Sequence, residues 1–148
     1  MPSTHISLLY HLVFSTKKRH PWITESWQQG LHSYLGGILR GLGGVAESIG
    51  GATDHVHVLA SLKATHCLAD IMRELKSGSS HWVHETIGIG MFGWQDGYGA
   101  FTVGRSEVDW IKQYIRQQKE HHRRKSFQEE YLELLRQSGI DFDERYVW

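Results

Sequence analysis

Apolar residues alternate with other residues in several short stretches of the chain, which is the pattern of half-buried strands. The pattern predicts a first strand at His5–Phe14, a short second strand at Val45–Ile49, a third at His55–Leu62 and a fourth near Ala100–Val103. The pair Gly50-Gly51 is expected to break the chain after the second strand.

Between and after these strands, apolar residues recur at intervals of three and four, the spacing of helices that bury one face. Four helices are expected, with these start signals and inward-facing residues: Thr24 before Trp27–Leu42, then Leu68–Trp82, then Ser106 before Val108, Ile111 and Ile115, and last a Ser126/Glu129 capping box before Phe127, Tyr131, Leu134 and Leu135. Gly36 and Gly37 weaken the first helix and are expected to allow close packing on a sheet. Gly139 is expected to end the last helix.

The order of these elements is β-α-β-β-α-β followed by further helices, which is the ferredoxin-like split βαβ pattern. The sequence therefore predicts an α+β fold: an antiparallel sheet with helices on one face, plus C-terminal helices that carry Tyr114. On that arrangement, the sheet face of His55 and His57 is expected to stay partly open. No repeat or linker interrupts the chain, so residues 1–148 are predicted to form one domain.

Composition limits the class of protein. The 16 Lys and Arg residues balance 16 Asp and Glu residues, which counts against a nucleic-acid binder. The distribution is less even, because Lys112–Lys125 holds six basic residues and one acid, whereas Ser126–Trp148 holds six acids and two arginines. No apolar run is long enough to span a membrane, and the charges near the N-terminus follow the apolar run, the wrong order for a secretory signal. A single cysteine, Cys67, fits a cytoplasmic protein.

Two pairs of residues carry candidate chemistry. His55 and His57 stand at i and i+2 of a strand, so both imidazoles point to one face and could bind one metal ion. Tyr114 and Gln118 stand at i and i+4 of a helix, so a phenol nucleophile and a carbonyl ligand would share one face. Each pair alone has an ordinary structural alternative: a solvated strand face for the histidines, and packing at the edge of the core for Tyr114.

In combination the two pairs are specific, and the chain resembles a known family. The resemblance runs through "YHLVFSTKKRHPWI", "DHVHVL", "WQDGYGAFTV" and "YIRQQKEHHRRKSFQEEYLELL". These motifs are similar to those of the single-tyrosine HUH transposases of small bacterial insertion sequences, the IS200-like transposases. The similarity covers nearly the whole chain, with no departure at a position that carries chemistry.

This resemblance implies a mechanism. A divalent cation, Mg²⁺ or Mn²⁺, would be held by His55, His57 and Gln118, and Tyr114 would attack the scissile phosphate. The products would be a 5′-phosphotyrosine and a free 3′-OH, and a 3′-OH could reverse the step to join DNA ends. The mixed nitrogen and oxygen ligands suit Mn²⁺ well. The substrate would be single-stranded DNA with hairpins, and the protein would act as a homodimer in which one tyrosine can serve the metal site of the partner.

Phosphate contacts are expected from basic residues and histidines near these motifs: Lys17, Lys18, Arg19, Lys112, Lys119, His121, His122, Arg123 and Arg124. Any of these could equally be an ordinary solvated side chain. Trp22, Trp94 and Tyr98 could stack on bases, although packing is the simpler role. Four other histidines, His5, His11, His81 and His84, are assigned to structure. Two competing functions remain: a domesticated, non-catalytic DNA-hairpin-binding protein of the same fold, and a metal hydrolase that activates water.

Overall fold

Four strands form one antiparallel sheet in the order β2-β3-β1-β4 in the computed structural model, which describes residues 3–118, 125–145 and 147. The strands are β1 (Leu9–Ser15), β2 (Val45–Gly51), β3 (His55–Ser61) and β4 (Gly99–Val103). The two central strands pair from Leu9 with Ser61 to Ser15 with His55. Strand β3 therefore lies in the middle of the sheet, where both of its faces can be covered.

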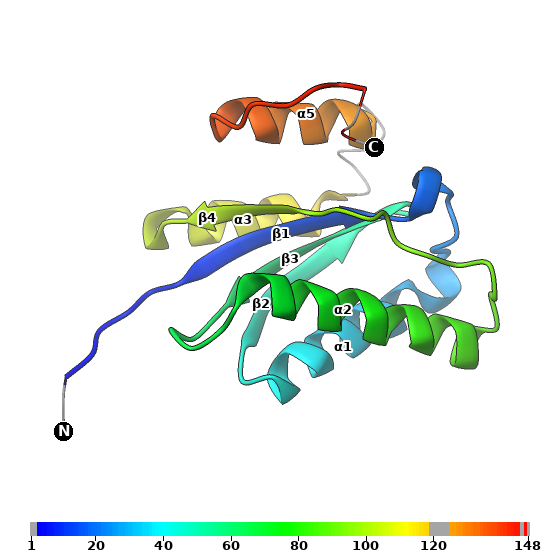
Figure 1. Cartoon of the computed structure of the whole chain (residues 1–148), viewed down its shortest axis with the longest axis horizontal. Helices are drawn as coiled ribbons and strands as arrows, with labels where there is room; N and C mark the ends of the chain where they lie inside the picture. The colour runs from blue at the N-terminus through cyan, green and yellow to red at the C-terminus, as the bar shows by residue number, and fades with distance from the viewer. Residues whose placement is uncertain (1–2, 119–124, 146, 148) are drawn as a thin grey trace.

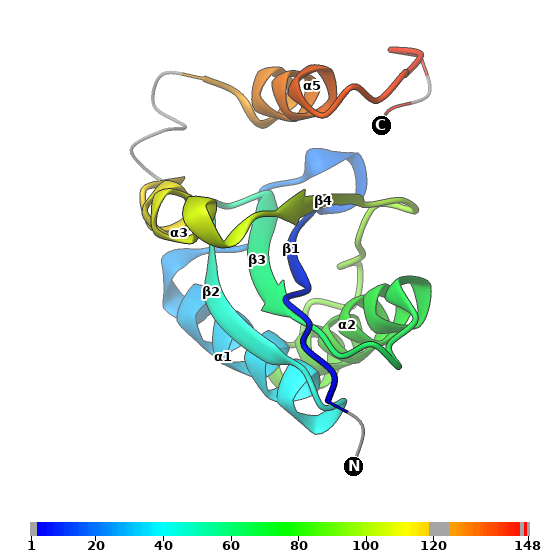
Figure 2. The same cartoon turned by 90° about the vertical axis from the view of Figure 1, so that its left-hand side faces the viewer.

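Helices lie on both sides of this sheet (Figures 1 and 2). The described helices are α1 (Glu25–Gly41), α2 (Leu68–Trp82), α3 (Val108–Arg116) and α5 (Phe127–Gln137), with short turns η1 (Lys17–Arg19), η2 (Val83–Ile87) and η3 (Arg105–Glu107). Helices α1 and α2 cover one face, and α3 and α5 lie across the other, as Figure 2 shows.

The main core lies between the sheet and helices α1 and α2. Alternate residues of the central strands point into it, which is what the period of two along a strand requires. It contains Leu12, Phe14, Val56, Val58 and Ala60 of the sheet together with Leu31, Leu35, Leu39, Ile71, Met72 and Leu75 of the helices. A β-carbon at Gly36 of α1 would make only ordinary van der Waals contacts with Ile49 and Ala46, at 3.7 and 3.8 Å, and one at Gly37 would meet nothing within 4 Å. The packing of α1 on the sheet therefore does not require glycine at either position, contrary to the prediction.

Two smaller apolar clusters attach α3 and α5 to the opposite face. In one, Val108, Ile111 and Ile115 of α3 pack on Leu9, Leu59 and Val103, and in the other, Phe127, Tyr131 and Leu135 of α5 pack on Val13 and Phe101. The expectation that the face of His55 and His57 stays partly open is therefore wrong, because both histidines have no exposed surface under these helices. The apolar side chains of α3 and α5 need a surface to bury, and this face provides it.

The predicted α+β class and split β-α-β-β-α-β order are confirmed. Some boundaries differ. Strand β1 begins at Leu9, where its pairing with both β3 and β4 begins, and not at His5. Gly50 and Gly51 belong to β2 instead of breaking it, and the turn to β3 follows them.

The predicted cap at Ser106 is also wrong, because Ser106 lies inside η3, whose capping contact is the Glu107 carboxylate on the Gly104 N–H. The Ser126 cap of α5 is confirmed, with its hydroxyl accepting from the Glu129 N–H. Gly139 follows the helix with a positive φ of 67°, as a helix-ending glycine should. Among the described residues, no helix has the length and apolar character needed to cross a membrane.

Candidate active site

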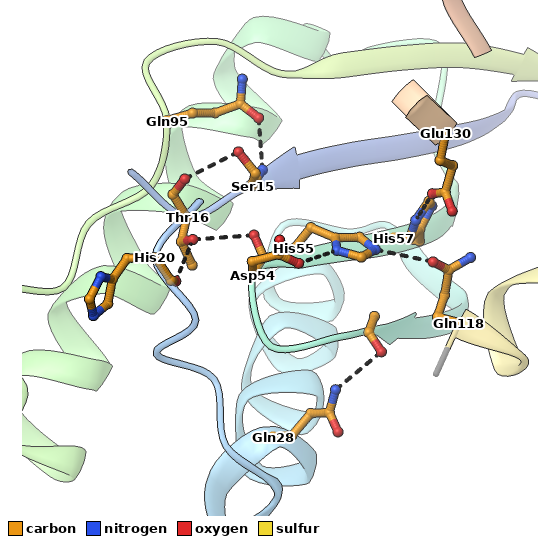
Figure 3. Close-up of polar contacts among 11 residues, drawn as sticks. Ser15, Thr16, His20, Gln28, Asp54, His55, His57, Gln95, Gln118 and Glu130 are labelled. Carbon is orange, nitrogen blue, oxygen red and sulfur yellow. Dashed lines mark hydrogen bonds and ion pairs between the residues drawn. The ribbon is translucent and has the colours of Figure 1, made fainter. Parts of the chain in front are cut away.

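Two fully buried histidines of β3 form the centre of the site. The alternation along β3 directs His55 and His57 to the sheet face that α3 and α5 cover, and their ring centroids are 5.0 Å apart. Figure 3 shows both imidazoles between the end of β1 and the side chains of Gln118 and Glu130. A buried imidazole needs partners for both of its nitrogens.

The contacts of His55 suit a cation. Its Nδ1 lies 2.8 Å from the Asp54 carboxylate, which accepts the Nδ1 proton, and its Nε2 lies 3.1 Å from the side-chain oxygen of Gln118. That oxygen is assigned by the other end of the amide, because the Gln118 Nε2 donates to the Tyr114 carbonyl at 3.2 Å. In neutral His55, a nitrogen lone pair and a carbonyl oxygen would then face each other. A bound cation, or a second proton on His55, would make the contact between His55 Nε2 and the Gln118 oxygen favourable.

His57 lies between two further buried polar residues. Its Nε2 lies 2.8 Å from Glu130 Oε1, and its Nδ1 lies 2.7 Å from His11 Nε2. Burial and the neighbouring His57 lower the pKa of His11 to about 3. His11 is therefore neutral at pH 7, and its Nε2 can accept the Nδ1 proton of His57, which leaves the His57 Nε2 lone pair directed toward Glu130.

Three of these residues form a possible metal-binding group. One ligand atom each from His55, His57 and Glu130 lies within 4.8 Å of the other two, and all three residues are buried. Two imidazole nitrogens and a carboxylate oxygen are donors that divalent transition metals accept. The chemistry of this donor set thus fits the divalent cation that the sequence implied, with Gln118 beside it.

Tyr114 of α3 lies against the same group. Its half-buried ring is edge-on to His57, with centroids 5.7 Å apart, and stacks on Trp110 at 5.4 Å. Burial raises the pKa of the Tyr114 phenol, and the Glu130 carboxylate raises it further, so the phenol is neutral in this arrangement. A cavity of about 490 Å³ between β4, α3 and α5 is lined by His11, Trp110 and Tyr114 among others.

The structure brings together the four residues that the sequence proposed for chemistry: Tyr114, His55, His57 and Gln118. Helix α3 ends at Arg116, so Gln118 lies two residues beyond it, and its side chain contacts His55 and the Tyr114 carbonyl.

The predicted phosphate contacts are dispersed. Lys17, Lys18 and Arg19 form η1 directly after β1, and Ser15 at the end of β1 pairs with His55. The Lys112 Nζ lies 3.8 Å from Glu47 Oε2 of β2. Lys119, His121, His122, Arg123 and Arg124 lie outside the described residues. Of the candidate stacking residues, Trp94 is buried in the main core, where its Nε1 donates to Ser79.

Sequence reasoning missed His11 and Glu130. His11 was assigned to structure, although it lies on the same strand face as Val13, which pairs with His57. Only the pairing of β1 with β3 reveals that neighbourhood. Glu130 has no motif of its own, and its contact with His57 depends on how α5, the helix that carries it, packs on the sheet.

Comparisons with known proteins indicate the family and the fold of the chain. The sequence model of the family described as "Transposase IS200 like" matches residues 4–118. A "putative transposase" of Deinococcus radiodurans R1 is 26% identical, with a TM-score of 0.64 over 78% of this chain and 93% of that one. A REP-associated tyrosine transposase, solved bound to a REP hairpin, shares the fold at 14% identity, with a TM-score of 0.58 over 78% of this chain and 68% of that one.

No curated protein matches the chain. The family match spans well over half of the residues and includes both histidines, the tyrosine and the glutamine of the site. This chain belongs to the IS200-like transposase family.

Proposed function

We propose that this protein cleaves and rejoins single-stranded DNA through a 5′-phosphotyrosine on Tyr114. One observation carries the proposal: the Tyr114 phenol lies in the same buried site as His55, His57 and Gln118. A nucleophile beside a group of metal-ligand atoms is the arrangement that phosphoryl transfer needs.

His55, His57 and Gln118 would hold a divalent cation, Mg²⁺ or Mn²⁺. Such a cation would polarise a phosphate oxygen and orient the scissile bond. The carboxylate of Asp54 on His55 Nδ1, and His11 on His57 Nδ1, keep the Nε2 lone pairs directed into the site. These contacts at the Nδ1 atoms fix the orientation of the two imidazole rings.

The reaction conserves one phosphodiester bond. The Tyr114 oxygen forms a bond to phosphorus as its proton leaves, the bond from phosphorus to the 3′ oxygen breaks, and that oxygen takes up a proton as a 3′-OH. The 5′-phosphotyrosine retains the bond energy, so a 3′-OH can attack it and restore both the DNA strand and the tyrosine. No nucleotide cofactor is required.

The substrate we infer is single-stranded DNA that carries hairpins near the ends of an insertion sequence. The basic turn Lys17–Arg19 supports this, because it follows the strand end that pairs with His55. The structure of a REP-associated tyrosine transposase bound to a REP hairpin also supports a hairpin-bearing substrate.

We further propose that residues 1–148 act as one domain in the cytoplasm, as a homodimer whose tyrosine can serve the site of the partner. Twofold dimers are the commonest oligomers. Light scattering at micromolar concentration should report about twice the 17.0 kDa of one chain. A monomer with full cleavage activity would contradict the dimer alone and leave the chemistry unaffected.

The product distinguishes the proposed reaction from its two alternatives. The protein is incubated with Mn²⁺ and a hairpin-bearing single strand that is labelled 3′ of the cleavage site. Tyrosine chemistry gives a covalent protein–DNA adduct that survives denaturation. A water-activating hydrolase gives a free 5′-phosphate, and a non-catalytic hairpin-binding protein gives a complex without cleavage. Either of these two results would overturn the proposal.

A further inference from the structure

Glu130 is a buried carboxylate in an unexpected place. It is 2% exposed, and it lies in α5, beyond the residues 4–118 that match the family. Burial of an ionised carboxylate is costly unless partners compensate for the lost water. The side chains that face it therefore indicate what holds it there.

Those side chains belong to the site. Glu130 Oε1 lies 2.8 Å from His57 Nε2, the nitrogen that faces the proposed cation, and the carboxylate also interacts with Tyr114. Together with His55, it completes a set of ligand atoms that one ion could bind. Figure 3 shows Glu130 descending from α5 onto His57, on the side of the site where Gln118 approaches His55.

We propose that Glu130 is a metal ligand of the DNA-free protein, and that the scissile phosphate takes its place when DNA binds. This inference rests on the proposed function. A phosphate under attack by Tyr114 must lie between the tyrosine and the cation, and the Glu130 carboxylate lies against both Tyr114 and His57. Both groups present anionic oxygens, so one can replace the other as a ligand, but the two cannot occupy the same position.

The attachment of α5 is compatible with such an exchange. Helix α5 takes no part in the strand pairing of the sheet. It contacts β1 and β4 through a small apolar cluster that is separate from the main core. Figure 2 shows α5 as the outermost layer beyond the sheet. Displacement of α5 would therefore leave the strand pairing and the main core intact.

Mn²⁺ binding without DNA tests the ligand assignment, by calorimetry on the full chain. Glu130→Gln keeps the size of the side chain but removes its charge, and we expect it to weaken Mn²⁺ affinity about tenfold or more. The matched control is Glu133→Gln on the same helix, which is 49% exposed beside Lys125 and should leave the affinity unchanged. Equal Mn²⁺ affinity in wild type and Glu130→Gln would overturn the assignment.

Wild-type protein provides a second measurement in case the variant does not fold. In a crystal soaked with Mn²⁺ and free of DNA, the anomalous signal should lie within bonding distance of a Glu130 oxygen and of both imidazoles. An ion bound by His55 and His57 with Glu130 turned away would contradict the proposal.

Saturating DNA tests the exchange. In a Tyr114→Phe background, which prevents cleavage, the effect of Glu130→Gln on Mn²⁺ affinity should disappear once a hairpin-bearing single strand is bound. A persistent tenfold effect would mean that the phosphate does not replace the carboxylate. Failure of the proposed function is distinguishable, because it shows as absence of a covalent adduct in wild type, whereas the DNA-free Mn²⁺ comparison requires no cleavage.

Discussion

Gly50 of β2 lies so close to the backbone carbonyl of Ile115 in α3 that a β-carbon at position 50 would overlap with that oxygen. Gly50 also pairs with His57 of β3. The missing side chain therefore lets the helix that carries Tyr114 settle onto the sheet beside the histidines. Gly50, which the sequence pattern assigns to a break after the second strand, is a positioning residue for the site.

Gly50→Ala should push α3 away from the sheet. Because the obstacle is backbone, we expect overpacking to lower the free energy of unfolding by about 1–3 kcal/mol, and adduct formation to fall more steeply than the folded fraction. The control is Gly37→Ala, where nothing lies within 4 Å of the added methyl group and the helix should gain stability. Thermal unfolding and adduct yield measure the two effects. Unchanged adduct formation in Gly50→Ala would show that α3 can shift without consequence.

His11 should orient His57 through the 2.7 Å contact between their ring nitrogens. His11→Leu removes the acceptor, and we expect Mn²⁺ affinity to drop about tenfold, the usual scale for an outer partner of a metal-bound imidazole. His11→Gln keeps an acceptor and should recover part of the loss. His84→Ala serves as control, since His84 contacts the Phe92 carbonyl rather than the site. Equal calorimetric Mn²⁺ affinities for wild type and His11→Leu would show that His11 does not orient His57.

Features of the site that depend on local structure could be predicted from the sequence, whereas features that depend on long-range contacts could not. The pairs His55/His57 and Tyr114/Gln118 follow from the periods of a strand and a helix, so they were recognisable without a structure. His11, Glu130 and the close approach at Gly50 depend on which strands pair and on how α3 and α5 pack. No spacing along the chain encodes those contacts.

The basic turn η1 should contact DNA phosphates. Lys17→Gln combined with Lys18→Asn removes two charges, and asparagine tolerates the left-handed φ of 55° at position 18. If each lysine contacts one phosphate, the slope of log affinity against log salt for a hairpin-bearing single strand should decrease by about 0.7 per lost contact. The control is Arg73→Gln. Arg73 pairs with Asp70 of the same helix, α2, which covers the other face of the sheet, so this change should leave the slope unchanged. An unaltered slope in the double variant would place the DNA elsewhere.

The two apolar layers should respond differently to truncation. Leu35→Ala opens a cavity in the main core and should cost about 2–5 kcal/mol of unfolding free energy. Leu135→Ala should mainly loosen α5, because Leu135 belongs to the separate cluster on the other face. Hydrogen exchange should then rise in α5 while β1 and β3 stay protected. Equal acceleration in the central strands would mean that α5 and the main core unfold as one unit.

Tyr114 should become covalently linked to DNA. Wild type, Tyr114→Phe and the exposed control Tyr98→Phe are each incubated with Mn²⁺ and a hairpin-bearing single strand labelled 3′ of the cleavage site. The protein is then digested, and the labelled peptide is mapped. We expect label on the peptide that contains Tyr114 in wild type and Tyr98→Phe, and none in Tyr114→Phe, which should still bind DNA and Mn²⁺. Label on Tyr98 or Tyr131, or an adduct that persists in Tyr114→Phe, would show that Tyr114 is not the nucleophile.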